Sequence, residues 1–143
     1  MHEISQKDYL NVILAFDYGE ARVGVAIKPA EQVSAEPLVT LSNDARLMDM
    51  VKELVDLHSP GLVIVGWPRS LDAEKTQQTE KAEQFASQVA QRYNIKVELQ
   101  DEALSTQRAE AKIPRKFRGD RSSVIDQYAA CVILEDYLQE KSR

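Results

Sequence analysis

The fold is decided by residues 12–27, which read VILAFDYGEARVGVAI. The first five residues are apolar and partly β-branched, as in a buried strand. Residues 18–20 predict a turn, and residues 23–27 form a second short apolar run, so the stretch predicts a β-hairpin. Asp17 interrupts this pattern, because it places a carboxylate at the end of a buried strand, where an unpaired charge is costly.

The rest of the chain alternates between strand-like and helix-like segments. Short apolar runs predict further strands at residues 38–41, 62–65 and 95–99, the second of them ending at Gly66-Trp67-Pro68. Apolar stripes at helical spacing predict helices between a cap at Ser42 or Asn43 and Pro60, and at 74–93, 105–111 and 123–139. The uninterrupted run at 62–65 is typical of a strand covered on both faces. The order predicts an α/β fold, a five-stranded mixed sheet flanked by helices.

The composition fits one domain over residues 1–143, with 43% hydrophobic and 29% charged residues. No apolar run approaches the roughly 20 residues that span a bilayer, and the polar first residues lack a signal-peptide core. The single cysteine, Cys131, leaves no intrachain disulfide and has apolar neighbours, as a small core residue would. We therefore expect a cytoplasmic protein with no membrane partner.

The net charge of −5 argues against a surface coated with cations for non-specific nucleic-acid binding. Residues 112–121 are the exception, with five cations against one acid. Arg115, Lys116 and Arg118 lie in this segment and are predicted to contact a nucleic-acid backbone. The alternative is a solvated basic loop.

Three carboxylates stand at the ends of predicted elements: Asp17 and Glu102 each end a strand, and Asp126 lies in the first turn of the last helix. If the two strands are adjacent and parallel, all three acids meet at one edge of the sheet. A set of oxygen ligands favours Mg²⁺ or Mn²⁺, and two such ions can activate water and stabilise a leaving oxygen. The pattern predicts a metal-dependent phosphodiesterase.

Each acid also has a structural alternative. Asp17 could form a turn with its own backbone, and Glu102 could face water at a strand end. Asp126 could close a capping box with Ser123. Each alternative is favoured when its acid is considered singly, but not when all three element ends are considered together.

Four segments, in order, resemble the YqgF/RuvX family, small single-domain proteins of the RNase H-like superfamily. They are residues 13–26, residues 63–68 with Asp72, Asp101-Glu102 with Ser105-Thr106, and Asp126 with Ala129-Ala130 and Ile133-Leu134. The resemblance implies one RNase H-like (YqgF-type) domain over 1–143. It also implies that Asp17, Glu102 and Asp126 are the catalytic, metal-binding acids.

The family is associated with maturation of the 5′ end of the pre-16S rRNA, and it is also described as Holliday-junction-resolvase-like. The resemblance thus implies a nuclease in ribosome biogenesis that uses Mg²⁺ or Mn²⁺. Its implied partners are an rRNA precursor or branched DNA, together with the ribosomal precursor particle. We expect a monomer or a weak homodimer.

Three further residues are candidates for nucleic-acid contact. Arg22 follows Asp17 closely and could meet a phosphate, or it could be a surface charge on the hairpin. Trp67 could stack on a base, worth roughly 1–3 kcal/mol, or pack on a neighbouring helix. Arg69 could continue the same path.

Two other functions remain open. Asp-x-Gly after a strand also opens the phosphate loop of sugar-kinase and actin-like ATPase domains, although those enzymes close two domains around a nucleotide and this chain is short. A non-catalytic RNA- or ribosome-binding module is the other, because Ala103 stands where the family usually has arginine.

Overall fold

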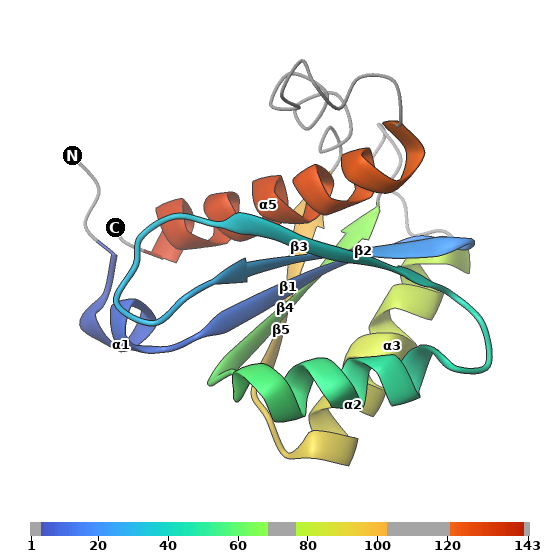
Figure 1. Ribbon diagram of the computed structural model, residues 1–143, viewed down its shortest axis with the longest axis horizontal. Helices are drawn as coiled ribbons and strands as arrows, with labels where there is room; N and C mark the ends of the chain where they lie inside the picture. Colours follow the sequence, from blue (N-terminus) through green and yellow to red (C-terminus); the bar gives the residue numbers. More distant parts are fainter. Residues whose placement is uncertain (1–3, 69–76, 103–120, 142–143) are drawn as a thin grey trace.

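The computed structural model describes residues 4–68, 77–102 and 121–141 (Figure 1). Its sheet contains β1 (Ile13–Tyr18), β2 (Arg22–Lys28), β3 (Glu36–Ser42), β4 (Leu62–Pro68) and β5 (Val97–Glu102). The strand order is β3-β2-β1-β4-β5; β2 is antiparallel to β1 and β3, whereas β1, β4 and β5 are mutually parallel. The predicted five-stranded mixed sheet and its opening hairpin are confirmed.

Helices cover both faces of the sheet. They are α1 (Gln6–Leu10), α2 (Leu47–His58), α3 (Gln77–Tyr93) and α5 (Arg121–Lys141). Helices α2 and α3 lie on one face, and α5 crosses the other, which we call the α5 face (Figure 1). The short helix α1 was not predicted. The predicted helix at 105–111 and the basic loop after it lie outside the described residues.

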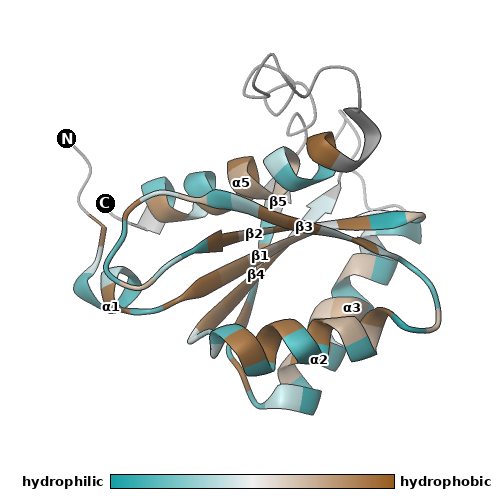
Figure 2. Cartoon of the chain, viewed as in Figure 1, coloured by the Kyte–Doolittle hydropathy of each residue, from teal (hydrophilic) through white to brown (hydrophobic). Residues whose placement is uncertain are grey.

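Alternation along β1 builds two cores, one on each face of the sheet (Figure 2). Leu14 and Phe16 face α2 and α3, where the Phe16 ring meets Phe85 edge-on with centroids 5.6 Å apart. Ile13 and Ala15 face α5 and pack with its buried apolar residues. Residues 62–65 of β4 are buried throughout, which confirms a strand covered on both faces.

Several predicted boundaries are wrong. Strand β5, predicted at 95–99, spans Val97–Glu102. Strand β4 continues through Pro68. Its pairing with β1 ends at Gly66, but its pairing with β5 continues to Pro68. Helix α2 starts at Leu47 rather than after Ser42 or Asn43. Helix α5 already starts at Arg121, so Asp126 lies in its second turn.

Because α5 starts at Arg121, Ser123 lies inside the helix and is not its N-cap. The capping box proposed for Ser123 and Asp126 is therefore excluded. Cys131 is buried on the α5 face, as predicted for a core residue. Among the described residues, no helix combines the length and the apolar character needed to cross a membrane.

Candidate active site

Asp17 lies on the α5 face of the central strand β1, two residues after Ala15. Its neighbours in the sheet are Gly24 on β2 and Gly66 on β4. On the three central strands, the Asp17 carboxylate therefore lies between two glycines, which have no side chains. Paired residues of adjacent strands share a face, so both glycines lie under α5.

The two glycines let α5 approach the sheet closely. A Cβ atom at Gly24 would lie 2.0 Å from the backbone oxygen of Asp126, and one at Gly66 would lie 2.1 Å from Cδ1 of Ile133. Gly24 has no room for a side chain, because the contact is with the helix backbone, whereas at Gly66 the end of the Ile133 side chain would have to move. The sequence reasoning overlooked these glycines; their spacing from Asp17 became meaningful only once the strand register was known.

Small residues on α5 contribute as well. Ala130 is fully buried and packs against Ala26, which is two residues beyond Gly24 on β2. A side chain this small lets the helix lie close to the sheet. The backbone of α5 is thus held near the end of β1, and Asp126 is held with it.

Asp17 and Asp126 lie close enough to influence each other. Burial raises the pKa of the Asp17 carboxyl from 3.8 to about 7, and the negative charge of Asp126 adds to this shift. Two of the three predicted acids are therefore together, at a site where ionisation of Asp17 is unfavourable. A divalent cation would relieve both causes, and carboxylate oxygens are the ligands that Mg²⁺ and Mn²⁺ prefer.

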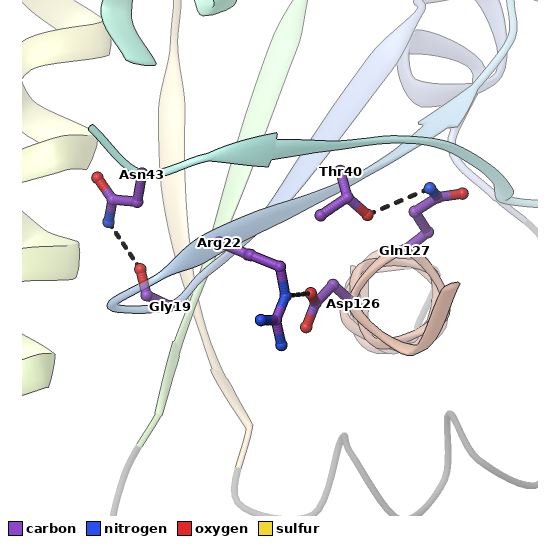
Figure 3. A network of polar contacts seen from close by, with 6 residues as sticks. All are labelled: Gly19, Arg22, Thr40, Asn43, Asp126 and Gln127. Atoms are coloured by element: carbon purple, nitrogen blue, oxygen red, sulfur yellow. Dashed lines mark hydrogen bonds and ion pairs between the residues drawn. The ribbon is translucent and has the colours of Figure 1, made fainter. Parts of the chain in front are cut away.

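Arg22 also belongs to this site. Its Nε donates to Oδ2 of Asp126 at 2.5 Å, joining residues 104 positions apart in the chain (Figure 3). The Arg22 side chain is 46% exposed and that of Asp126 is 20% exposed. The guanidinium thus stands between the acid and solvent, but its predicted contact with phosphate stays a prediction.

The turn between Asp17 and Arg22 is held by Asn43, which follows β3 (Figure 3). The Asn43 side-chain amide donates to the carbonyl oxygen of Gly19 at 2.7 Å, and its backbone N–H donates to that of Ala21 at 3.0 Å. Asn43, predicted as a helix cap, therefore positions the hairpin turn instead. Its sequence signal was ambiguous, because asparagine serves both purposes.

A second contact ties α5 to the sheet beside Asp126. The side-chain amide of Gln127 donates to Oγ1 of Thr40 on β3 at 3.2 Å (Figure 3). Nothing in the sequence linked these residues in advance.

Glu102 is the last residue of β5, and its backbone pairs with Pro68. Of the two conditions set for the acids to meet, β5 is parallel to β1 but not adjacent to it, because β4 lies between them. The Glu102 side chain lies outside the described part of the chain. Within that part, no group of three or more His, Cys, Asp or Glu is gathered as a metal site.

Trp67 is partly buried and packs against the core under α2 and α3, the face opposite to Asp17. This is the packing that the sequence allowed as the alternative to base stacking, and a role in binding stays a prediction. Arg69, Arg115, Lys116 and Arg118 lie outside the described residues.

A family model described as RuvX, Holliday junction resolvase, matches residues 11–140. A Paraburkholderia phymatum protein named "Putative pre-16S rRNA nuclease" is 39% identical over 128 residues, which cover 88% of this chain and 83% of that protein. A Legionella pneumophila protein of the same name is 35% identical over 133 residues, covering 90% and 96%.

Solved structures of Thermus thermophilus RuvC share the fold. RuvC alone matches with a TM-score of 0.57 at 14% identity, covering 92% of this chain and 97% of that chain. RuvC in complex with a Holliday junction substrate matches with a TM-score of 0.58 at 14% identity, covering 92% and 96%. The RNase H-like fold expected from the sequence is confirmed.

Proposed function

This chain belongs to the RuvX family, and we propose that it is a metal-dependent nuclease that acts on the pre-16S rRNA. The protein is a hydrolase of phosphodiester bonds, as the descriptions of its family and its relatives indicate. The observation that carries the proposal is the Asp17–Asp126 pair, two acids held together under α5 at the end of the central strand. A purely structural site gains nothing from such a pair, whereas perturbed acids gather at functional sites.

Asp17, Asp126 and Glu102 are the residues proposed to hold Mg²⁺ or Mn²⁺. When bound, such an ion supplies an activated water and stabilises the leaving oxygen. Side chains two residues apart on a strand share a face, and two residues of β5 before Glu102 already contact α5. The hydroxyl of Tyr137 donates to Glu98 at 3.0 Å, and the amide of Gln100 donates to Glu140 at 3.2 Å. Strand β5 is thus tied to α5 as far as Gln100, and the metal-binding role of Glu102 is part of the proposal.

The protein's own residues would divide the remaining work. Asp17, with its raised pKa, is poised to exchange its proton for a cation near neutral pH. Arg22 places a cation on the solvent side of Asp126. An acidic protein needs such local cations to hold a polyanion, and we assign the same role to Arg69, Arg115, Lys116 and Arg118. Trp67 is a candidate for base stacking.

The substrate assignment comes from the names of the relatives and is the finer part of the proposal. Branched DNA is the second candidate, favoured by the description of the family model as a Holliday junction resolvase. We further propose that the protein acts in the cytoplasm on the ribosomal precursor particle, as a monomer or weak homodimer. A non-catalytic RNA-binding role is the alternative that a cleavage assay distinguishes.

The test compares wild type with Asp17→Asn and Asp126→Asn, each supplied with Mg²⁺ or Mn²⁺. The substrates are a pre-16S rRNA fragment, a four-way DNA junction and ATP. We expect RNA cleavage to fall by at least about a hundredfold in both variants, because each loses a charged ligand.

Asp56→Asn is the matched control, since Asp56 is an exposed acid on α2 paired with Lys52 at 2.7 Å. It should cleave like wild type. Junction cleavage without RNA cleavage would move the assignment to DNA. Tight RNA binding without cleavage under either metal would replace the nuclease with the binding module.

A further inference from the structure

Asp17 and Asp126 differ in what neutralises them. Asp126 has a counter-ion, because Nε of Arg22 donates to its Oδ2 at 2.5 Å. Asp17 makes no hydrogen bond or ion pair with any other residue that the structure describes. Arg22 is therefore paired with Asp126 alone, and Asp17 has no counter-ion among the described residues.

The contact between Arg22 and Asp126 uses only part of the guanidinium. Figure 3 shows Nε in the contact and both terminal nitrogens outside it. Those nitrogens have no hydrogen-bond partner within the described residues. Arginine often binds carboxylates with two parallel hydrogen bonds, which fix both partners. A contact through Nε alone is more easily exchanged.

The two partners also differ in their freedom to move. Asp126 is fixed, because its backbone lies against Gly24 and the next residue, Gln127, is bonded to Thr40. Arg22 is at the start of β2, with a long side chain that is 46% exposed. If the two separate, the guanidinium is the group that leaves, and it leaves towards solvent.

We infer that Arg22 is a resident counter-ion of Asp126 that a divalent cation displaces, so that metal binding releases the guanidinium for a substrate phosphate. This rests on the proposed metal-dependent function. Two cations near one carboxylate repel each other, so the arginine and the metal compete for Asp126. The arginine holds the Asp126 side chain in place before the metal arrives, and it lowers the affinity of the site for the metal.

The test is a titration of the full chain with Mn²⁺, followed by the melting temperature rather than by cleavage. It compares wild type, Arg22→Gln and Lys81→Gln. Lys81 is the matched control, because it is an exposed cation 3.8 Å from Glu20 and its loss changes the net charge equally. Arg22→Gln should bind Mn²⁺ on the order of tenfold more tightly than wild type, and Lys81→Gln should stay within about twofold.

Equal or weaker Mn²⁺ binding by Arg22→Gln, with binding retained in wild type, would overturn the inference and leave the proposed function standing. Equal tightening in Lys81→Gln would overturn it too, because the effect would then be one of net charge. If no Mn²⁺ concentration stabilises wild type or either variant, the metal site fails and the proposed function fails with it.

Discussion

The two ends of the β1–β2 hairpin each bury a charge, and the protein treats these charges in opposite ways. Asp17 is near one end, paired in the sheet with Gly24, and Lys28 is at the other, paired with Ile13. Lys28 is fully buried, and its ammonium donates to the carbonyl oxygens of Tyr9 at 3.3 Å, Pro29 at 2.7 Å and Gln32 at 3.0 Å.

Burial lowers the pKa of Lys28, while the nearby carboxylate of Asp8 opposes that shift. The ammonium has three donors and three acceptors, so its hydrogen-bonding capacity is filled, and it ties α1 and the segment after β2 to the sheet. Asp17 has no such set among the described residues. A buried charge with complete partners stabilises a fold, whereas one without them is available for ligand binding.

Lys28→Met tests the structural half of this comparison and carries the largest expected effect on stability. Removing the ammonium takes one donor from each of three carbonyl oxygens, although that of Tyr9 still accepts from the backbone N–H of Glu31 at 2.6 Å. The loss should cost roughly 3–5 kcal/mol in the free energy of unfolding. Lys52→Met is the control, because Lys52 is exposed and paired with Asp56 one helical turn away; it should leave the free energy of unfolding nearly unchanged. Equal, small losses in chemical denaturation would show that the Lys28 contacts contribute little.

Gly24→Ala tests the packing that brings Asp126 to Asp17. The new methyl group would meet the backbone of α5, which has no rotamer to change, so the helix must shift. We expect a loss of about 2–3 kcal/mol together with weaker metal binding. Gly61→Ala is the control, since its methyl group meets the side chain of Asn11, which can turn away. Similar melting temperatures for the two variants would argue against a tight α5 contact.

The stability of metal-free protein should depend on pH through Asp17. Its pKa is about 7 in the folded chain and about 3.8 when unfolded, so folding favours the neutral acid. The stabilisation of the folded chain by the neutral acid is complete below about pH 4. It is lost as the pH rises from about 4 to 7, and it is absent above pH 7. Asp17→Asn should thus match wild type near pH 4 and be more stable by roughly 1–3 kcal/mol at pH 8. A constant difference across this range would contradict the raised pKa of Asp17.

Much of the fold could be predicted because its signals are local. The hairpin at 12–27, the doubly covered strand at 62–65 and the stripe of α3 each depend on apolar residues a few positions apart. The boundaries were less predictable, because tertiary pairing decides them. Gly66 and Pro68 would end an isolated strand, yet β5 extends β4 past both.

The site was predicted as three acids at one edge of the sheet, but the residues that surround them were not predicted. Asp17 and Asp126 could be chosen by their positions at element ends, and the structure brings them together. The separation of β1 from β5 could not be foreseen, since strand order is a long-range property. The contact between Arg22 and Asp126 spans 104 residues, and the need for Gly24 appears only once α5 is in place.

The central claim is that Asp17 is a partly buried acid without a partner among the described residues, and that a metal binds there. It is tested most directly by the melting temperature with and without saturating Mn²⁺ at pH 7.5, for wild type and Asp17→Asn. At a hundred times its dissociation constant, the metal should stabilise wild type by about 2.7 kcal/mol, and it should stabilise the variant much less. Equal Mn²⁺-induced shifts in the two proteins would contradict the account.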